Sequence, residues 1–477
     1  MSAFATAGIR VGDVGDRHVV VWGFGREGRA AVDVLRRHGR PASITVVVDA
    51  PGGTEVNDEE VLVAGSSAGR AAVANADIVV KSPGVSPYMG LFAELTGGKT
   101  ITGGTALWFA EMGSARSVGI TGSKGKSTTS TLVHHLLTAL GEDVVLAGNI
   151  GRAPIEVLGV ELDRRAGAAG ERGLPDRWVF ELSSFQSAEV SSGPEFGILT
   201  SLFPEHLNWH GSVERYYADK LNLFADQRCT LAANFGNSDV ARLMAERART
   251  NWFGGFDSIH GDGRRVVDAD GSLLVDLSPT KLLGAHNVSN VAGALTAIRA
   301  MGHDLGKCAD DLRASLQAFR PLAHRLEPVG SIDGRLVVDD SLSTAPQAAV
   351  AALEAYADVA VSIIVGGFDR GLDYQPLADA CAARRRPTWV LGVPQSGERL
   401  IPLIANAVAD AGSGHVVVEG FDDFDAAVLA AQRRTPAGGV ILLSPGAPSF
   451  GRFVDYRERG LHFRRVLGLD ETVGPDA

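Results

Sequence analysis

Short apolar runs alternate along the chain with segments whose apolar residues recur at helical spacing, and the runs end in glycine-rich or polar turns. The run 18–22 leads through Gly23-Phe-Gly25-Arg-Glu-Gly28 into a helical segment, and the next run, 44–48, ends in Asp49. This order predicts a βαβ unit with a glycine-rich turn at the helix start. The turn is typical of dinucleotide-binding folds, but it holds any diphosphate, including that of a sugar nucleotide. The run 77–85 fits the same doubly wound domain.

A second glycine-rich turn follows the apolar run 118–121 and opens another helical segment. Gly122 and Gly125 let successive backbone N–H groups point inward at a polyphosphate. Lys126 supplies a cation for the outer phosphates, and Ser127 or Thr128 supplies a hydroxyl for Mg²⁺. The spacing departs from the strict G-x-x-x-x-G-K-S pattern. We interpret this turn as an ATP phosphate loop, against the alternative of a strand-to-helix turn that binds nothing.

Polar residues gather at the ends of the next predicted strands. Glu181 ends the run 178–181, where the carboxyl ends of parallel strands face the ligand crevice, so it is placed to bind the Mg²⁺ of a nucleotide. A solvated glutamate is the alternative. His206 and His210 follow another strand and suggest a metal or phosphate site, or a polar loop with one partnered histidine. Lys220 becomes a metal ligand only as a carbamate, which the sequence cannot reveal.

Two asparagines, Asn287 and Asn290, lie three apart at the start of a helical segment and suit recognition of a purine edge, although helix capping explains at least one of them. Beyond them, the apolar runs 336–338, 361–365 and 439–443 each end in a glycine or polar cluster and predict another α/β sheet. We therefore expect an α/β protein of three domains, at 1–104, 105–320 and 321–477.

Composition narrows the class of protein. The chain has 477 residues and a net charge of −11, which disfavours a general nucleic-acid binder. No secretory signal or apolar run long enough to span a membrane is present, and the three scattered cysteines form neither a disulfide framework nor a zinc motif. We expect a cytoplasmic enzyme that is a monomer and binds no nucleic acid or membrane.

The motifs, in their order along the chain, resemble those of the Mur ligases of peptidoglycan synthesis, and most closely the branch that adds glutamate to UDP-N-acetylmuramoyl-L-alanine. The resemblance covers nearly the whole length and rests on Thr121-Gly-Ser-Lys-Gly-Lys-Ser-Thr128, Gly148-Asn-Ile-Gly151, Glu181-Leu-Ser-Ser-Phe-Gln186, Gly284-Ala-His-Asn-x-x-Asn290, and Gly366-Gly-Phe-Asp-Arg-Gly-Leu-Asp373. It implies an ATP-dependent acid–amino-acid ligase with a Rossmann-like UDP-binding domain, a central P-loop-type ATPase domain and a Rossmann-like C-terminal domain.

The resemblance also implies a role for each matching residue. ATP and Mg²⁺ are the expected cofactors, and the catalytic residues are Lys126, Glu181, His206 and Lys220 as a carbamate; the last three, with Ser127, hold metal. ATP is bound by Gly122, Ser123, Lys124, Gly125, Lys126, Ser127, Thr128, Asn287, Asn290, Arg325 and Asp340. The UDP-sugar is bound by Gly23, Gly25, Arg26, Glu27, Gly28, Asp49, Ser82, Pro83, Gly84, Asn149, Ser183 and Gln186. Glutamate is bound by Thr344, Arg370, Ser449 and Tyr456.

Several positions depart from the family pattern. Lys124 stands where the phosphate loop has Asn, Glu205-His206-Leu-Asn208 replaces Asp-His-x-Asp, and Leu342 replaces a lysine. The segments 21–29 and 202–210 look like the subgroup that adds L-glutamate, which we expect as the substrate, with D-glutamate as the alternative. Two other classes remain open: a nicotinamide oxidoreductase, which leaves the second phosphate loop unused, and a nucleotide-binding regulator without catalysis, if Asn208 and Leu342 abolish turnover.

Overall fold

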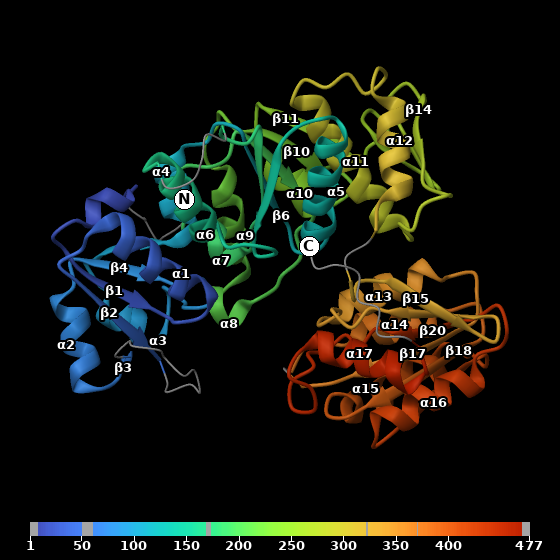
Figure 1. The fold of residues 1–477 in the computed structure, drawn as a ribbon. Helices are drawn as coiled ribbons and strands as arrows, with labels where there is room; N and C mark the ends of the chain where they lie inside the picture. Colours follow the sequence, from blue (N-terminus) through green and yellow to red (C-terminus); the bar gives the residue numbers. More distant parts are fainter. Residues whose placement is uncertain (1–7, 50–60, 168–172, 321–322, 370, 470–477) are drawn as a thin grey trace. The chain divides into compact units, whose positions relative to one another are not determined.

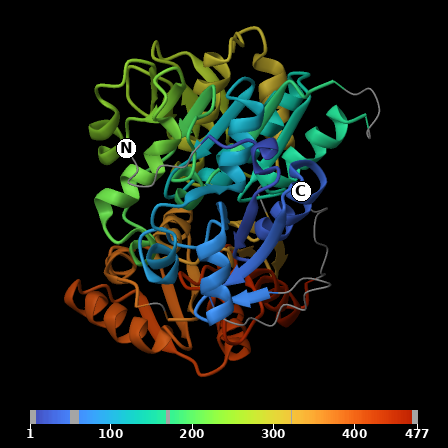
Figure 2. The same ribbon diagram turned by 90° about the vertical axis from the view of Figure 1, so that its left-hand side faces the viewer.

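The computed structural model describes residues 8–49, 61–167, 173–320, 323–369 and 371–469. The chain forms two compact units, the first comprising 1–276 with 289–317 and the second 277–288 with 318–477. Figures 1 and 2 show the ribbon in two views. Among the described residues, no helix combines the length and the apolar character that crossing a membrane requires.

The N-terminal sheet is parallel, with strand order β3-β2-β1-β4-β5. Successive residues of β1 point to opposite faces: Val19 and Val21 pack with α1, whereas Val20 and Trp22 pack in a second cluster with α2 and α3. Helices on both faces make this a doubly wound sheet, as the sequence predicted. Its elements are η1 (Val11–Val14), β1 (His18–Trp22), α1 (Arg26–Val34), η2 (Leu35–Gly39), β2 (Ser43–Val48), β3 (Val61–Val63), α2 (Ser67–Asn75), β4 (Ile78–Lys81), α3 (Gly90–Leu95) and β5 (Thr100–Gly103).

The central sheet is also parallel, with order β11-β10-β9-β6-β8-β7. Its elements are α4 (Gly104–Met112), β6 (Ser117–Thr121), α5 (Lys126–Ala139), β7 (Val144–Gly148), α6 (Pro154–Arg165), β8 (Arg177–Glu181), α7 (Ser184–Ser187), β9 (Phe196–Leu199), α8 (Leu207–His210), α9 (Val213–Leu221), η3 (Asn222–Phe224), β10 (Thr230–Asn234), α10 (Ser238–Met244) and β11 (Thr250–Phe253). An antiparallel sheet of β12 (His260–Asp262), β13 (Arg265–Val267) and β14 (Leu273–Asp276) follows, then α11 (Ala285–Ala300) and α12 (Ala309–Ala318).

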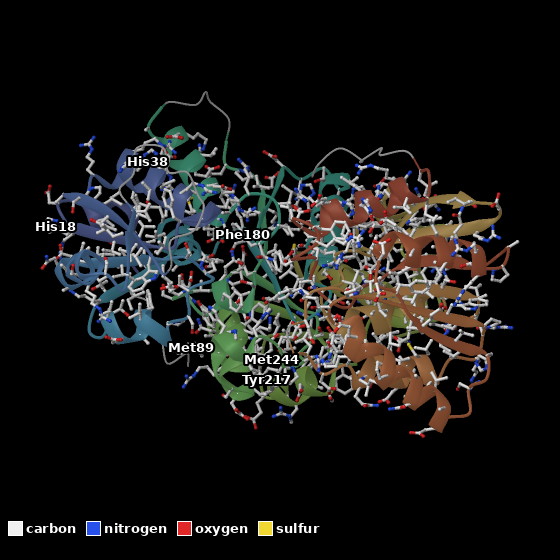
Figure 3. All side chains as sticks on the ribbon, turned by 90° about the horizontal axis from the view of Figure 1, so that it is seen from below. His18, His38, Met89, Phe180, Tyr217 and Met244 are labelled. Atoms are coloured by element: carbon white, nitrogen blue, oxygen red, sulfur yellow. The ribbon has the colours of Figure 1, made fainter. Side chains whose placement is uncertain are left out.

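One hydrophobic core runs through both parallel sheets of the first unit. Trp108 of α4 meets Phe180 of β8 with ring centroids 4.5 Å apart, and the same cluster includes Val19 of β1. Figure 3 labels Phe180 among the side chains. The sequence boundary proposed at residue 104 therefore falls where β5 passes into α4, inside a continuous core. This packing fixes the glycine-rich turn of the first sheet relative to the phosphate loop of the second.

The second unit has a mixed sheet of order β15-β16-β20-β17-β18-β19, in which only the β15–β16 pair is antiparallel. Alternate residues of β17 divide between two cores, Ile363 on one face and Ile364 on the other. Its elements are β15 (Glu327–Ile332), β16 (Arg335–Asp339), α13 (Pro346–Ala355), β17 (Val361–Gly366), α14 (Gln375–Ala382), β18 (Thr388–Val393), α15 (Gly397–Asp410), β19 (Val416–Gly420), α16 (Phe424–Arg434), β20 (Val440–Leu443) and α17 (Tyr456–Val466).

Candidate active site

The predicted phosphate loop joins β6 to α5. Gly122 and Gly125 have φ of 154° and 88°, in the region that favours glycine. A Cβ at Gly122 would come within 2.0 Å of Thr200 Oγ1, so the loop also needs glycine for space. Lys126, the first residue of α5, folds back over the loop and donates to the carbonyls of Gly122 at 2.8 Å and Ser123 at 3.0 Å. The loop is therefore shaped, with its lysine in place, at a helix N-terminus that favours anions.

Lys220 reaches the same loop from α9. Its side chain is buried, and Nζ donates to the carbonyl of Gly122 at 2.9 Å. Burial, and then the charge of Lys126, lower the pKa of Lys220 well below its usual range. A lower pKa increases the share of the neutral amine, the form that reacts with CO₂, so this environment suits the carbamate that the family resemblance implies.

Glu181, at the end of β8, is 1% exposed. Its Oε1 accepts a hydrogen bond from Asn149 Nδ2 at 3.2 Å, while Oε2 has no partner among the described residues. A buried carboxylate oxygen without a partner is costly unless a ligand satisfies it. This orphaned oxygen fits a bound cation, and Asn149, which we had assigned to the UDP-sugar, orients the carboxylate.

His206 has a left-handed backbone, with φ of 53°, and precedes α8. His206 is exposed to solvent, but partial burial of its ring lowers its pKa to about 4. The charge of Glu205 opposes this shift, and the charge of Lys220 adds to it. A ring that is neutral at pH 7 offers a nitrogen lone pair to a metal. Glu181, His206 and Lys220 therefore supply donor groups that fit Mg²⁺, although Mg²⁺ prefers oxygen and carbamylation of Lys220 would add it.

Two of the departures from the family pattern contact each other. Lys124 Nζ lies 2.7 Å from Glu205 Oε1, with 37% and 19% of the two side chains exposed. Burial alone would raise the pKa of Glu205, but Lys124 and Lys126 outweigh it and hold that pKa below its usual value. The extra lysine of the phosphate loop and the altered acid beside His206 thus form one ion pair.

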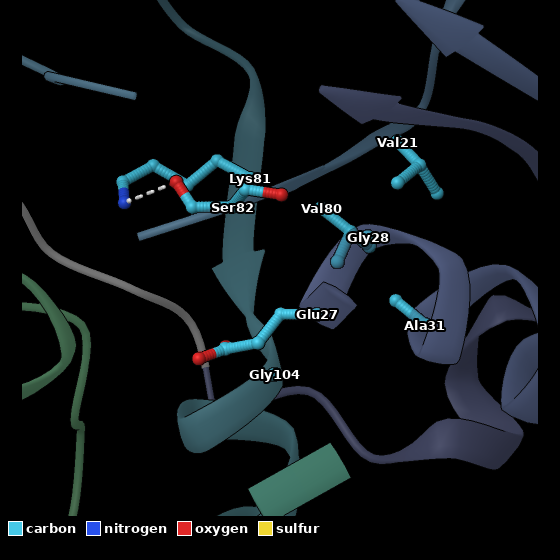
Figure 4. Close-up of a pocket in the computed structure, with 8 residues that line it drawn as sticks. All are labelled: Val21, Glu27, Gly28, Ala31, Val80, Lys81, Ser82 and Gly104. Carbon is cyan, nitrogen blue, oxygen red and sulfur yellow. Dashed lines mark hydrogen bonds between the residues drawn. The ribbon is translucent and has the colours of Figure 1, made fainter. Parts of the chain in front are cut away.

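The glycine-rich turn of the first sheet is bonded to the central sheet. Arg26 donates to the carbonyl of Gly151 at 2.7 Å, and Gln186 Nε2 donates to Glu27 Oε1 at 2.8 Å. Burial, followed by the charge of Glu189, raises the pKa of Glu27 to about 7. Glu189 forms a fully buried ion pair with Lys81. Figure 4 shows Glu27, Gly28, Lys81 and Ser82 among the residues that line a small pocket beside this turn.

The remaining residues proposed for the UDP-sugar lie around this turn. Ser82 donates to the carbonyl of Gly23 at 3.0 Å, and a Cβ at Gly28 would lie 2.0 Å from that carbonyl oxygen. Asp49 accepts from the Trp22 indole at 3.0 Å, so its carboxylate is already engaged. Ser183 caps α7 in a reciprocal pair with Gln186, which donates to Glu27. Gly25 caps α1, and Pro83 and Gly84 follow Ser82 after β4.

Two asparagines had been assigned to ATP, and they differ in their contacts. Asn290, in the first unit, lies against the phosphate loop, since a Cβ at Gly125 would be 2.6 Å from Asn290 Oδ1. Asn287 Nδ2, in the second unit, donates to the carbonyl of Leu283 at 2.8 Å within its own helix start. This bond is a donation to a carbonyl four residues earlier and not an N-cap contact, in which the side chain would accept, so the proposed roles of Asn287 and Asn290 toward ATP both stay predictions.

In the second unit, Asp340 is 5% exposed and accepts from Ser444 Oγ at 2.6 Å and from the N–H of Leu326 at 3.1 Å. Burial raises the pKa of Asp340 to about 7, and Arg325 opposes this rise. Of the residues proposed for glutamate, Thr344 is exposed after β16, Ser449 is buried after β20, and Tyr456 begins α17. Arg370 lies outside the described residues.

Sequence reasoning missed one buried charge network. His324 Nδ1 lies 2.7 Å from Asp339, and Arg464 donates to Asp339 at 3.0 Å and to Glu327 at 2.6 Å. Histidine and two carboxylates in this arrangement could hold a metal ion. Arg464 already supplies the positive charge, so we assign the cluster a role in packing. No sequence signal links Arg464 to residues more than a hundred positions earlier.

Comparisons with known proteins agree with these motifs. Residues 120–298 match the Mur ligase middle domain. A Micromonospora protein named UDP-N-acetylmuramoyl-L-alanine–L-glutamate ligase is 40% identical, over 98% of this chain and 100% of its own. A protein of the same name from Xanthomonas euvesicatoria is 38% identical, over 98% of each chain. Another from Salinispora tropica is 39% identical, over 96% of this chain and 99% of its own.

Solved structures support the fold. MurF from Acinetobacter baumannii has a TM-score of 0.54 at 14% identity, covering 94% of this chain and 89% of that one. MurF ligase from Thermotoga maritima, solved with ADP, has a TM-score of 0.53 at 17% identity, covering 96% and 95%. At these identities the likeness concerns the fold, whereas the near full-length match to the ligases above concerns the family. The chain belongs to the Mur ligase family, in the same branch as its glutamate-ligase relatives.

Proposed function

We propose that this protein uses ATP to join L-glutamate to the L-alanyl carboxylate of UDP-N-acetylmuramoyl-L-alanine. The observation that carries the proposal is the gathering of Lys126, Lys220, Glu181 and His206 around one phosphate loop, in a chain 38–40% identical to three relatives named for this L-glutamate reaction. The departures at Lys124 and Glu205 form an ion pair with each other, which supports a working site over an inactive regulator.

The chemical task is to make an amide from a carboxylate, which is a poor electrophile because attack adds charge to a negative group. Phosphorylation by ATP overcomes this: the alanyl carboxylate attacks the γ-phosphorus, ADP leaves, and an acyl phosphate forms. The glutamate amine then attacks the acyl carbon and loses a proton, and inorganic phosphate departs. Each cycle therefore yields one peptide bond, one ADP and one phosphate.

Lys126 is the cation that acts on the transferring group. Its ammonium, which bonds the carbonyls of Gly122 and Ser123, turns to the outer phosphates when nucleotide enters. Ser127, Glu181, His206 and carbamylated Lys220 would hold Mg²⁺, which would neutralise charge on the phosphoryl group. Asn149 keeps the Glu181 carboxylate aimed at that position.

The other substrates use the residues assigned by resemblance. The UDP-sugar is bound by the turn 23–28, Asp49, the segment 82–84 and the pair Ser183–Gln186. ATP is further bound by Asn287, Asn290, Arg325 and Asp340. Arg370, with Thr344, Ser449 and Tyr456, binds glutamate by charge-assisted bonds to its carboxylates. We propose three domains, with boundaries at 104 and 320, in a cytoplasmic monomer.

The decisive experiment supplies ATP, Mg²⁺ and UDP-N-acetylmuramoyl-L-alanine with either L- or D-glutamate, and measures phosphate release together with product mass. We expect a product of one added glutamate with the L enantiomer. Product with D-glutamate alone would transfer the proposal to the D-adding reaction, and no product with either would reject ligase activity.

Arg370 is tested separately. Arg370→Ala should raise the glutamate KM at least tenfold and leave the ATP KM near the wild-type value, because a charge-assisted contact to one substrate is lost. Arg385→Ala, at an exposed arginine of the same unit, is the matched control. An unchanged glutamate KM in the Arg370 variant would remove this residue from the glutamate site.

A further inference from the structure

Three buried side chains of the first unit form a hydrogen-bonded chain that has no part in the proposed reaction as described so far. Ser184 Oγ lies 2.9 Å from His210 Nε2, and His210 Nδ1 lies 2.7 Å from Asp219 Oδ2. Tyr88 extends the chain by donating its hydroxyl to Asp219 Oδ1 at 2.6 Å. Ser184 is 2% exposed, and His210 and Asp219 are fully buried.

The order serine, histidine, aspartate is that of a hydrolase triad. A nucleophilic serine, however, must meet an acyl group, and here the ring of His210 is stacked on Phe185, with centroids 5.6 Å apart, and faces Tyr216 edge-on at 5.2 Å. With all three members of the chain buried, no substrate reaches Ser184. The arrangement therefore fixes side chains in place and does not attack a substrate.

The chemistry of the partners shows which atom donates in each of these hydrogen bonds. Asp219 offers only acceptors, so His210 Nδ1 carries a proton and donates to it. In the neutral ring Nε2 is then an acceptor, and the Ser184 hydroxyl donates to it. Aspartate thus selects one tautomer and one orientation of the ring, and the ring in turn holds the serine.

Each member of this chain lies close in sequence to one proposed metal ligand. Ser184 begins α7, just beyond Glu181 at the end of β8. His210 ends α8, the short helix that His206 caps. Asp219 directly precedes Lys220 in α9. The three segments come from different parts of the chain, and the bonds Ser184–His210–Asp219 tie them to one another.

We infer that His210 and Asp219 are positioning residues that set the mutual spacing of Glu181, His206 and Lys220 for Mg²⁺, an inference that rests on the proposed function. Groups that orient metal ligands from behind commonly affect metal affinity nearly as strongly as the ligands do. Through Tyr88 the hydrogen-bonded chain continues into the loop 84–88 that follows β4. In this loop Ser86 donates to the carbonyl of Trp209 at 2.6 Å, and Trp209 Nε1 donates to the carbonyl of Gly84 at 3.2 Å.

The test uses two variants and a matched control. Asp219→Asn replaces one of the two acceptor oxygens by an NH₂ donor, so that His210 and Tyr88 can no longer both donate to residue 219. Tyr88→Phe removes only the hydroxyl that bonds Asp219. Tyr217→Phe is the control, because Tyr217 is also in α9 and bonds an aspartate, Asp239 at 2.8 Å, outside this chain of bonds. Mn²⁺ binding to each folded protein is measured by electron paramagnetic resonance without nucleotide, and the Mg²⁺ dependence of turnover is measured in parallel.

We expect Asp219→Asn to weaken Mn²⁺ binding and to raise the half-saturating Mg²⁺ concentration about tenfold, and Tyr88→Phe about threefold, as for other residues that orient metal ligands. The glutamate KM should not change, and Tyr217→Phe should match wild type. Wild-type Mn²⁺ affinity in both variants would overturn the inference; if Asp219→Asn does not fold, Tyr88→Phe alone decides. Failure of the wild-type protein to form a peptide bond would reject the function and leave the Mn²⁺ result to judge the positioning role.

Discussion

Glu27 lies at the junction of the two parallel sheets and titrates near neutral pH. One of its oxygens accepts from Gln186, the other has no partner among the described residues, and Glu189 places a second acid nearby. Burial and this neighbour raise the pKa of Glu27 from 4.5 to about 7. Glu27→Gln removes the ionisable group while keeping an amide that can bond Gln186.

The pKa shift sets the size of the effect. A rise of this size means that ionising Glu27 destabilises the folded state, relative to the unfolded state, by about 3 kcal/mol. This value is an upper limit, because the side chain has some access to solvent. Because the folded state holds its proton more tightly than the unfolded state, ionising Glu27 costs nothing below pH 4.5, an increasing amount up to about pH 7, and a constant amount above it. The variant should therefore gain stability over wild type as pH rises, by about 2–3 kcal/mol at pH 8.5.

Urea unfolding at pH 5, 7 and 8.5, followed by tryptophan fluorescence, measures the difference, because all the tryptophans except Trp389 lie in the first unit. Glu94→Gln is the control: Glu94 is 58% exposed in α3 and pairs with Arg70, so its replacement should change stability by less than about 0.5 kcal/mol at every pH. Equal stability of Glu27→Gln and wild type at pH 8.5 would refute the assigned environment of Glu27.

Three further changes test the site. Lys126→Ala should remove at least 99% of phosphate release, a loss of about 3 kcal/mol in transition-state stabilisation; near-normal turnover would exclude the phosphate-loop role. Glu189→Gln leaves Lys81 buried without its partner and should lower the free energy of unfolding by about 3–5 kcal/mol, a loss largely recovered by adding Lys81→Met. In a double-mutant cycle of Lys124→Asn and Glu205→Gln, coupling in kcat/KM for ATP should be about 0.5–1 kcal/mol, and additive effects would show that the ion pair has no role in catalysis.

The fold could be predicted where the information is local. The run 18–22 and its glycine turn predicted β1 and α1, because a continuous apolar run, which is buried on both faces, is followed directly by the glycines of the turn, where Gly23 has a φ of 95°. Likewise, the strands proposed at 336–338, 361–365 and 439–443 correspond to β16, β17 and β20. The short strands β12–β14 and β15 were not predicted, since antiparallel pairs at the edge of a unit depend on partners and not on a long apolar run.

The residues of the candidate site could likewise be predicted only where they lie close together in the sequence. Gly122, Gly125 and Lys126 form one turn, so their spacing sufficed to locate it. Contacts such as that of His210 with Asp219 and Ser184 join segments that meet only after the central sheet forms. His210 could be singled out as a polar residue beside a strand end, but whether it binds metal or another side chain depends on burial and distance, which the pattern does not contain.

The charges around the phosphate loop indicate that the departures from the family pattern in this part of the site are related to one another. The family pattern places a neutral asparagine and two aspartates where this chain has Lys124, Glu205 and Asn208, so the segment carries two more units of positive charge here. Adding a cation beside Lys126 without a counter-ion would oppose the protonated lysine already present, and Glu205 supplies that counter-ion at 2.7 Å. Because incoming ATP is strongly anionic, the additional lysine attracts its phosphates, and the binding of nucleotide should depend on Lys124 more than the family pattern alone would predict.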